Sequence, residues 1–293
     1  IGMIFMDVSV VVPCTDRVLG FERCLKSILA QTTNMKFEVI VVENNSSDKS
    51  VIQDKINEIN DDRLKHFYLE DCSNANVARN YGVKKSTGEY VAFMDSDDFW
   101  LPDHIVNNLK FFKGSPMGLA IYSGHILENG IKDKIVASRA IGNETAYSFL
   151  FGETPGVAQT SSYLLKRSVF DSVEWDESLS RNQDYDFFIA VQDACGWLYN
   201  PIITSVVVWE NGIIRKFTVD AFKNFYGKHK NKMTRTDRAG YISRVLRALS
   251  QNSREEYSEF YSEGLLLRRD MRFPECLYSY GYRFAKLTLW VRG

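Results

Sequence analysis

Three carboxylates, Asp95, Asp97 and Asp98, directly follow the apolar run 90–94. Such a run predicts a buried strand, and parallel sheets place their ligand sites just beyond the carboxyl ends of strands. Crowded carboxylates repel one another unless a cation compensates them. The cluster therefore predicts a divalent metal that carries a diphosphate. The alternative is an acidic loop that only caps a helix at 102–112.

Short β-branched runs alternate with segments of helical periodicity around this cluster, which is typical of βαβ units. The predicted strands are Val8–Val12, Phe37–Val42, Leu64–Leu69, Tyr90–Met94 and Leu119–Ser123. Apolar residues between Phe21 and Leu29 recur with the spacing of a helix that packs on a sheet. We therefore expect an α/β fold with a mostly parallel sheet flanked by helices.

Capping signals mark the next helices. We expect residues 46–48 to cap one helix, Asn74 to precede a helix over 75–86, and Gly88 to provide its left-handed C-cap. Further on, Asn129-Gly130 predicts a hairpin, and strand-like segments at 162–165 and 205–209 flank a helix near 184–194. Helical periodicity resumes at about residue 218.

Composition bounds the class of protein. The 293 residues are 45% hydrophobic, enough for a large core, and the five cysteines are scattered without paired spacing, so we expect neither disulfides nor zinc. No apolar run approaches the roughly 20 residues of a membrane span, and a signal-peptide pattern is missing. We therefore expect a soluble, cytoplasmic protein.

Charge is unevenly distributed along the chain. Residues 218–293 hold 15 Lys and Arg against 8 Asp and Glu, although the whole chain has a net charge of −1. We predict two domains, 4–217 and a basic helical appendage at 218–293. The basic tail predicts either an ordinary solvated helical face or a peripheral contact with the inner face of an anionic membrane.

Several motifs together carry a resemblance to the family 2 glycosyltransferases. In chain order they are Ser9–Pro13, Val41–Asp48, Ala78–Gly82, Gly88–Asp98, Trp175–Leu179 and Asn182–Asp186. The resemblance covers roughly residues 7–215. It implies the GT-A fold, which is Rossmann-like, together with a nucleotide-sugar donor, a divalent metal (Mn or Mg) and inversion at the anomeric carbon. The GT-A domain would then be 4–217.

The resemblance also assigns roles to individual residues. Asp95 and Asp97 match the D-x-D pair, with Asp97 on the metal and Asp95 toward the ribose or a metal-bound water; Ser96 lies between them. The nucleoside contacts would be Pro13, Cys14, Thr15, Glu43 and Asn44. A guanidinium fits phosphate geometry, so Arg79 is a candidate for the diphosphate, its alternative being an ordinary surface arginine.

Asp184 matches the base that takes a proton from the acceptor hydroxyl. Its alternative role is a helix N-cap, and we rank it above Asp186, which would point elsewhere on a helix. One departure concerns the metal site: Trp209 stands where many relatives have a histidine, and Glu210 is a conceivable substitute.

Three other classes compete with this interpretation. A dinucleotide oxidoreductase would need a glycine-rich turn after the first strand, which 13–17 lacks. A processive membrane synthase would need spanning helices and a Gln-x-x-Arg-Trp motif. A non-catalytic member that binds nucleotide sugars or glycans is the serious alternative. We favour a transferase that uses a UDP-sugar and a glycan or lipid-linked acceptor in surface polysaccharide biosynthesis, with no nucleic acid partner.

Overall fold

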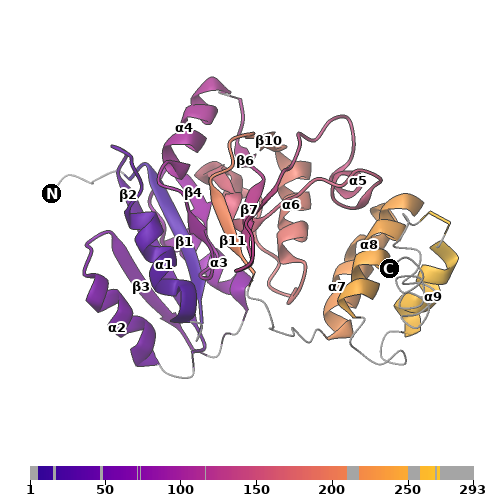
Figure 1. Ribbon diagram of the computed structural model, residues 1–293, viewed down its shortest axis with the longest axis horizontal. Helices are drawn as coiled ribbons and strands as arrows, with labels where there is room; N and C mark the ends of the chain where they lie inside the picture. The colour runs from indigo at the N-terminus through magenta and orange to yellow at the C-terminus, as the bar shows by residue number, and fades with distance from the viewer. Residues whose placement is uncertain are drawn as a thin grey trace. The chain divides into compact units, whose positions relative to one another are not determined.

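The computed structural model describes residues 6–15, 18–46, 49–70, 72, 74–115, 117–209, 218–249, 258–267 and 269–270. The chain divides into two compact units (Figure 1). The first comprises Ile1–Ala140 and Val157–Asn211, and the second Ile141–Gly156 and Gly212–Gly293. The segment 141–156 thus groups with the C-terminal helices, which its local sequence pattern did not indicate.

A seven-stranded sheet forms the centre of the first unit. Its order is β10-β6-β9-β4-β1-β2-β3, with bounds β1 Val8–Cys14, β2 Phe37–Asn44, β3 Leu64–Leu69, β4 Tyr90–Phe93, β6 Ala120–Tyr122, β9 Leu164–Lys166 and β10 Leu198–Tyr199. All neighbours run parallel except β9, which is antiparallel to β4 and β6. The predicted α/β class with a mostly parallel sheet is confirmed.

Helices cover both faces of this sheet. They are α1 Val18–Leu29, α2 Lys49–Ile59, α3 Ala75–Lys85, α4 His104–Gly114 and α6 Gln183–Ala194, with short 3-10 helices at Thr160–Ser162 (η1) and Arg167–Asp171 (η2). Phe21 and Leu25 of α1 are fully buried in the cluster that contains Val39 and Val41 of β2. Ala78 of α3 instead packs with the residues of β2 that point the other way.

Two glycines allow other segments to pack closely against β1. A Cβ on Gly82 of α3 would lie 2.4 Å from Cγ1 of Val11 on β1. The prediction that Gly88 is a left-handed C-cap is wrong: α3 ends at Lys85, and its C-cap is Ser86 with φ −72° and ψ 150°. Gly88 is required for a different reason, because a Cβ there would lie 2.6 Å from the backbone nitrogen of Ser9.

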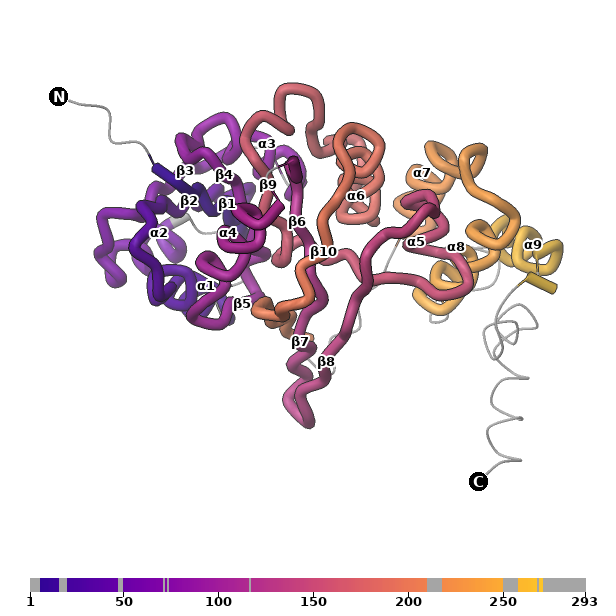
Figure 2. The backbone as a smooth tube through the Cα atoms, turned by 90° about the horizontal axis from the view of Figure 1, so that it is seen from above, coloured from indigo at the N-terminus to yellow at the C-terminus, as the bar shows by residue number. Residues whose placement is uncertain are grey.

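A second sheet extends the first unit. Its order is β5-β11-β7-β8, with β5 Phe99–Trp100, β7 His125–Glu128, β8 Lys134–Val136 and β11 Ser205–Val208. The predicted hairpin is present: β7 and β8 pair antiparallel, and Gly130 between them has φ +74°. Figure 2 shows this hairpin as a narrow projection.

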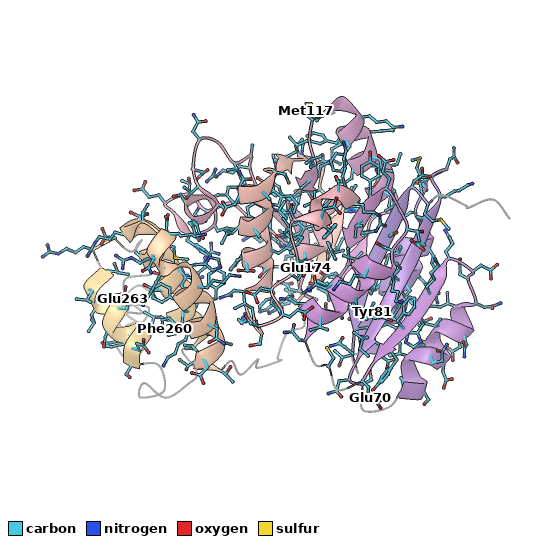
Figure 3. The ribbon with its side chains drawn as sticks, turned by 180° about the vertical axis from the view of Figure 1, so that it is seen from behind. Glu70, Tyr81, Met117, Glu174, Phe260 and Glu263 are labelled. Carbon is cyan, nitrogen blue, oxygen red and sulfur yellow. The ribbon has the colours of Figure 1, made fainter. Side chains whose placement is uncertain are left out.

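The second unit is helical where it is described. It contains α5 Ala146–Phe151, α7 Val219–His229, η3 Lys230–Lys232, α8 Arg235–Ala248 and α9 Ser258–Leu267. Its core is aromatic: Phe151 contacts Tyr241 edge to face at 5.3 Å, and Tyr226 stacks on Tyr241 at 5.6 Å. The Tyr226 hydroxyl donates to Glu263 of α9, labelled in Figure 3. Within the described residues, no helix is long and apolar enough to cross a membrane.

Candidate active site

The carboxyl ends of β1, β2 and β4 meet at one edge of the sheet, here called the carboxyl edge. Cys14 pairs with Glu43, and Val11 pairs with Phe93, so the residues that follow these strands emerge side by side. This register brings two predicted groups to the same edge. They are the nucleoside candidates Pro13, Cys14, Thr15, Glu43 and Asn44, and the acidic loop Asp95, Ser96, Asp97 and Asp98.

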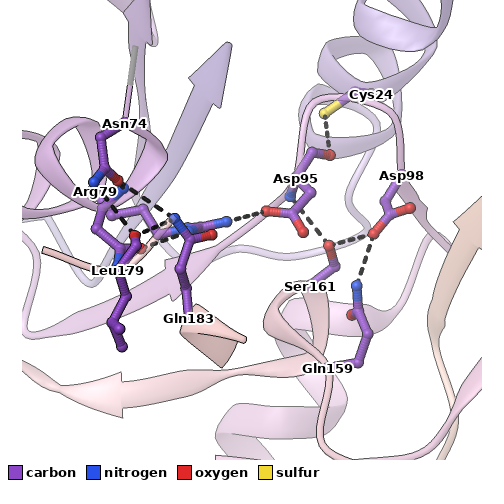
Figure 4. A network of polar contacts seen from close by, with 10 residues as sticks. Cys24, Asn74, Arg79, Asp95, Asp98, Gln159, Ser161, Leu179 and Gln183 are labelled. Atoms are coloured by element: carbon purple, nitrogen blue, oxygen red, sulfur yellow. Dashed lines mark hydrogen bonds and ion pairs between the residues drawn. The ribbon is translucent and has the colours of Figure 1, made fainter. Parts of the chain in front are cut away.

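Arg79 is held inside the first unit by three groups. The residue is only 6% exposed, so the surface-arginine alternative is wrong. It donates to Oδ1 of Asp95 at 2.7 Å (Figure 4). It also donates to Oδ1 of Asn76 at 3.0 Å, and its guanidinium lies 4.5 Å from the Trp175 ring. A buried guanidinium needs such partners. Arg79 therefore fixes one oxygen of Asp95.

Asp98 is a structural residue of the acidic loop. The residue is 2% exposed, and its Oδ2 accepts hydrogen bonds from Ser161 at 2.6 Å and Gln159 at 2.9 Å (Figure 4). Its Oδ1 accepts the backbone N–H of Val208 at 3.1 Å, which joins the loop to β11. Burial, with the nearby charges of Asp95 and Asp97, raises the pKa of Asp98 well above its usual range. These contacts do not support a role for Asp98 in capping α4.

Ser161 connects Asp95 and Asp98, the first and last residues of the acidic loop. Its Oγ accepts the backbone N–H of Asp95 at 3.1 Å while donating to Asp98. Gln159 and Ser161 belong to no sequence motif, because Ser161 lies in the short helix η1 and Gln159 is its N-cap. The sequence offered one signal for them: they are polar residues just before the apolar residues of β9.

Asp97 and Ser96 lie half-buried at the turn of the loop. Gly20 of α1, with φ +95°, approaches this turn so closely that a Cβ would lie 3.3 Å from the Asp97 Cα. The described residues contain no group of three or more His, Cys, Asp or Glu side chains placed to hold a metal ion. Asp95 and Asp97 supply carboxylate oxygens, the donor type that Mg²⁺ and Mn²⁺ prefer. Their chemistry therefore fits a divalent cation that also takes oxygens from a ligand.

Asp184 lies in the first turn of α6, two residues after the N-cap Asn182, whose φ is +56°. The cap position thus belongs to Asn182, not to Asp184. Burial is the main cause that raises the pKa of Asp184, and the charge of Asp95 adds to it. Asp186 is more deeply buried.

Three asparagines of the α3 segment bind the backbone that leads to Asp184. Asn74, Asn76 and Asn80 donate to the carbonyl oxygens of Glu177, Asp176 and Trp175 at 2.6, 2.6 and 2.9 Å. Trp175 then stacks on Phe187 of α6 at 3.9 Å. These contacts position the start of α6 beside α3. Of the three, only Asn80 lies in a family motif, and the sequence indicated no more for Asn74 than that it precedes the helix.

The β1 and β2 end of the carboxyl edge is more deeply buried. Glu43 is 0% exposed, and its Oε2 lies 2.9 Å from Nε2 of His66 on β3. Asn44 and Cys14 are buried as well, and burial, with the charge of Glu43, raises the pKa of the Cys14 thiol. Thr15 is exposed.

Trp209 follows β11 and is 52% exposed. Its backbone N–H donates to the carbonyl of Glu128 at 2.7 Å, which continues the pairing of β11 with β7. Glu210, the conceivable metal ligand, lies outside the described residues.

The architecture recurs in solved glycosyltransferases. Staphylococcus aureus TarS 1–349 in complex with UDP-GlcNAc superposes with a TM-score of 0.65 at 18% identity, over 91% of this chain and 82% of that one. The mannosyltransferase PcManGT of Pyrobaculum calidifontis, in complex with GDP-Man and Mn²⁺, gives 0.55 at 16% identity, over 94% and 74%. The fold is therefore that of the GT-A glycosyltransferases.

The sequence identifies the family more narrowly. The model for glycosyl transferase family 2 matches residues 9–173, more than half of the chain. The protein belongs to this family, as its motifs predicted.

Two relatives in this family are named for the biosynthesis of amylovoran and of colanic acid. The amylovoran biosynthesis glycosyltransferase AmsB of Erwinia amylovora is 30% identical over 192 residues, 62% of each chain. The putative colanic acid biosynthesis glycosyl transferase WcaA of Escherichia coli is 26% identical over 79% of this chain and 84% of its own. The UDP-Glc:alpha-D-GlcNAc-diphosphoundecaprenol beta-1,3-glucosyltransferase WfaP of Escherichia coli is 32% identical over 39% and 43%. The chain thus spans less than two thirds of AmsB and under half of WfaP.

Proposed function

We propose that this protein transfers a sugar from a nucleoside-diphosphate sugar, a UDP-sugar in particular, to a hydroxyl of a glycan or lipid-linked acceptor with inversion. The observation that carries this proposal is that α3 is bound to both acidic segments. Arg79 of α3 binds Asp95, and asparagines of the same segment bind the backbone that leads to Asp184.

The donor would bind along the carboxyl edge. Pro13, Cys14, Thr15, Glu43 and Asn44 would contact the nucleoside. Asp97 would bind Mn²⁺ or Mg²⁺, with Asp95 toward the ribose or a metal-bound water and Ser96 between them. The metal would neutralise charge that grows on the departing diphosphate.

Arg79 has a more specific role in this proposal than the sequence indicated. Its guanidinium is already bound to Asp95 and Asn76. It would therefore act first as a positioning residue for Asp95. The diphosphate would bind only those guanidinium N–H groups that Asp95 and Asn76 do not occupy. This division follows from the fixed fork of the guanidinium, which presents several N–H groups in one plane.

Asp184 would take the proton of the acceptor hydroxyl as its oxygen attacks the anomeric carbon opposite the leaving diphosphate. A raised pKa makes the carboxylate a stronger base than an ordinary aspartate. The acceptor would be a lipid-linked glycan, a class that the name of WfaP also contains. Contact of the basic segment 218–293 with an anionic membrane remains part of the proposal, as does its separation from the 4–217 domain.

The test is a panel of UDP-, GDP- and dTDP-sugars, scored for hydrolysis and transfer with Mn²⁺ and with EDTA. We expect metal-dependent turnover of one donor by the wild type. Turnover that persists undiminished in EDTA would contradict the metal role.

A second candidate function is binding of a nucleotide sugar or glycan without turnover. The observation that favours it is Trp209, which is exposed after β11 at the position where many relatives carry a histidine. Donor binding without turnover across the panel, with and without metal, would support this function and exclude the transferase.

A further inference from the structure

Glu43 is the first member of a chain of polar side chains that runs from β2 to α2. Its Oε2 lies 2.9 Å from Nε2 of His66, and Nδ1 of His66 lies 2.8 Å from Oε1 of Gln53. The amide of Gln53 is oriented in turn, because its nitrogen donates to Asn57 at 2.9 Å. The Glu43 carboxylate and the Gln53 oxygen can only accept, so the two bonds together require a hydrogen on each ring nitrogen of His66, as in the imidazolium form.

The other oxygen of Glu43 is in a different state. Oε1 is buried and has no hydrogen-bond partner in the described part of the chain. A buried acceptor without a donor is costly, so this oxygen is suited to a donor brought by a ligand. Glu43 also borders an open pocket of about 540 Å³ between the sheet and α2, lined further by Ser50, Gln53, Asp54, His66 and Tyr68.

We propose that His66 is a specificity-determining residue for the nucleobase, an inference that rests on the proposed function. By occupying Oε2, it leaves Glu43 with one free acceptor. The imide of uracil or thymine presents one N–H between two carbonyl oxygens, which matches a single acceptor. Guanine presents two adjacent N–H donors and would leave one of them unpaired against the His66 N–H.

The two carbonyl oxygens of uracil also favour a Glu43 with only one free acceptor. If both oxygens of Glu43 were free, the second would lie near a carbonyl oxygen of the imide and repel it. The His66 N–H neutralises that oxygen before the base arrives. Because Gln53 holds the opposite ring nitrogen, the imidazole cannot turn away without losing a second bond.

The experiment compares the affinities of UDP and GDP for the full chain by titration calorimetry with Mg²⁺. For the wild type we expect UDP to bind at least about tenfold more tightly than GDP. In His66→Leu, the UDP-to-GDP preference should fall at least about fivefold, because guanine gains the second acceptor. His66→Gln, whose amide can donate to Glu43, should restore the preference.

The control is His125→Leu, which also replaces a strand histidine, a buried one in the second sheet. It should leave the preference unchanged, and a thermal melt of each variant checks folding. An unchanged preference in His66→Leu, or equal wild-type affinities for UDP and GDP, would overturn the role of His66 alone. If the wild type binds neither nucleotide, the proposed function fails with it.

Discussion

The two ends of the carboxyl edge hold their acidic side chains in different ways. At the β4 end, Arg79 binds Asp95, while Ser161 and Gln159 bind Asp98. At the β2 end, one oxygen of Glu43 is bound by His66 and the other has no partner in the described residues. The β4 end is therefore positioned by the protein itself, whereas the β2 end keeps an acceptor available. Under the proposed function, the β4 end orients the groups that act in the reaction, and the β2 end recognises the base.

Replacing Asp97 is expected to have the largest effect and tests the β4 end directly. In Asp97→Ala, transfer should fall about 10⁴-fold, because metal stabilisation of the departing diphosphate is worth several kcal/mol. Initial rates over a Mn²⁺ titration measure this loss. The exposed Asp62→Ala is the matched control and should retain wild-type rates. A loss below tenfold would mean that Asp97 is not the metal ligand.

Asp184→Asn should lower kcat about 10³-fold while nucleotide affinity stays within a fewfold of wild type, since the base acts only on the acceptor. The pH dependence sharpens this prediction. A raised pKa means that the base is lost to protonation at a higher pH than an ordinary aspartate, whose pKa is about 3.9. The rate of the wild type should therefore fall on acidification with an inflection above that value. An equal loss in Asp186→Asn with unchanged folding would reassign the base.

Arg79→Leu should break the pre-formed geometry of the β4 end. It removes a charge-assisted bond to Asp95, and we expect the free energy of unfolding to fall by about 2 kcal/mol. Urea denaturation measures the change. Lys84→Leu on the exposed side of the same helix is the control and should alter stability by less than about 0.5 kcal/mol. Equal stability of the two variants would show that the Arg79–Asp95 pair does not hold the loop.

Asp98→Asn should give the smallest effect, seen as a change in the pH dependence of stability. The raised pKa means that the folded protein binds this proton more tightly than the unfolded chain does. Its contribution is present at low pH and is lost as the pH rises from about 4 through the folded-state pKa. The wild type should therefore lose stability over that range relative to the variant. Parallel stability curves from urea titrations at several pH values would contradict this.

Much of the fold followed from local patterns. The β-branched runs became β1, β2, β3, β4 and β6, and the apolar spacing between Phe21 and Leu29 became the buried face of α1. The Asn-Gly hairpin is also present. These features depend on residues close in sequence. The role of Gly88 was predicted incorrectly, because a glycine after a helix suggests a C-cap. A glycine is needed there because the backbone of Ser9, 79 residues away, leaves no room for a side chain.

The sequence by itself determined the class of fold, the family and the strand ends at which the acidic residues stand, because periodicity and contiguous motifs are local properties. Tertiary structure decided how those residues are used. It buried Arg79 against Asp95, made Asp98 a link to Ser161 and β11, and placed His66 against Glu43. The physical reason is that burial and hydrogen-bond partners depend on segments far apart in the chain. A carboxylate in a motif therefore acquires its role only from what the fold packs around it.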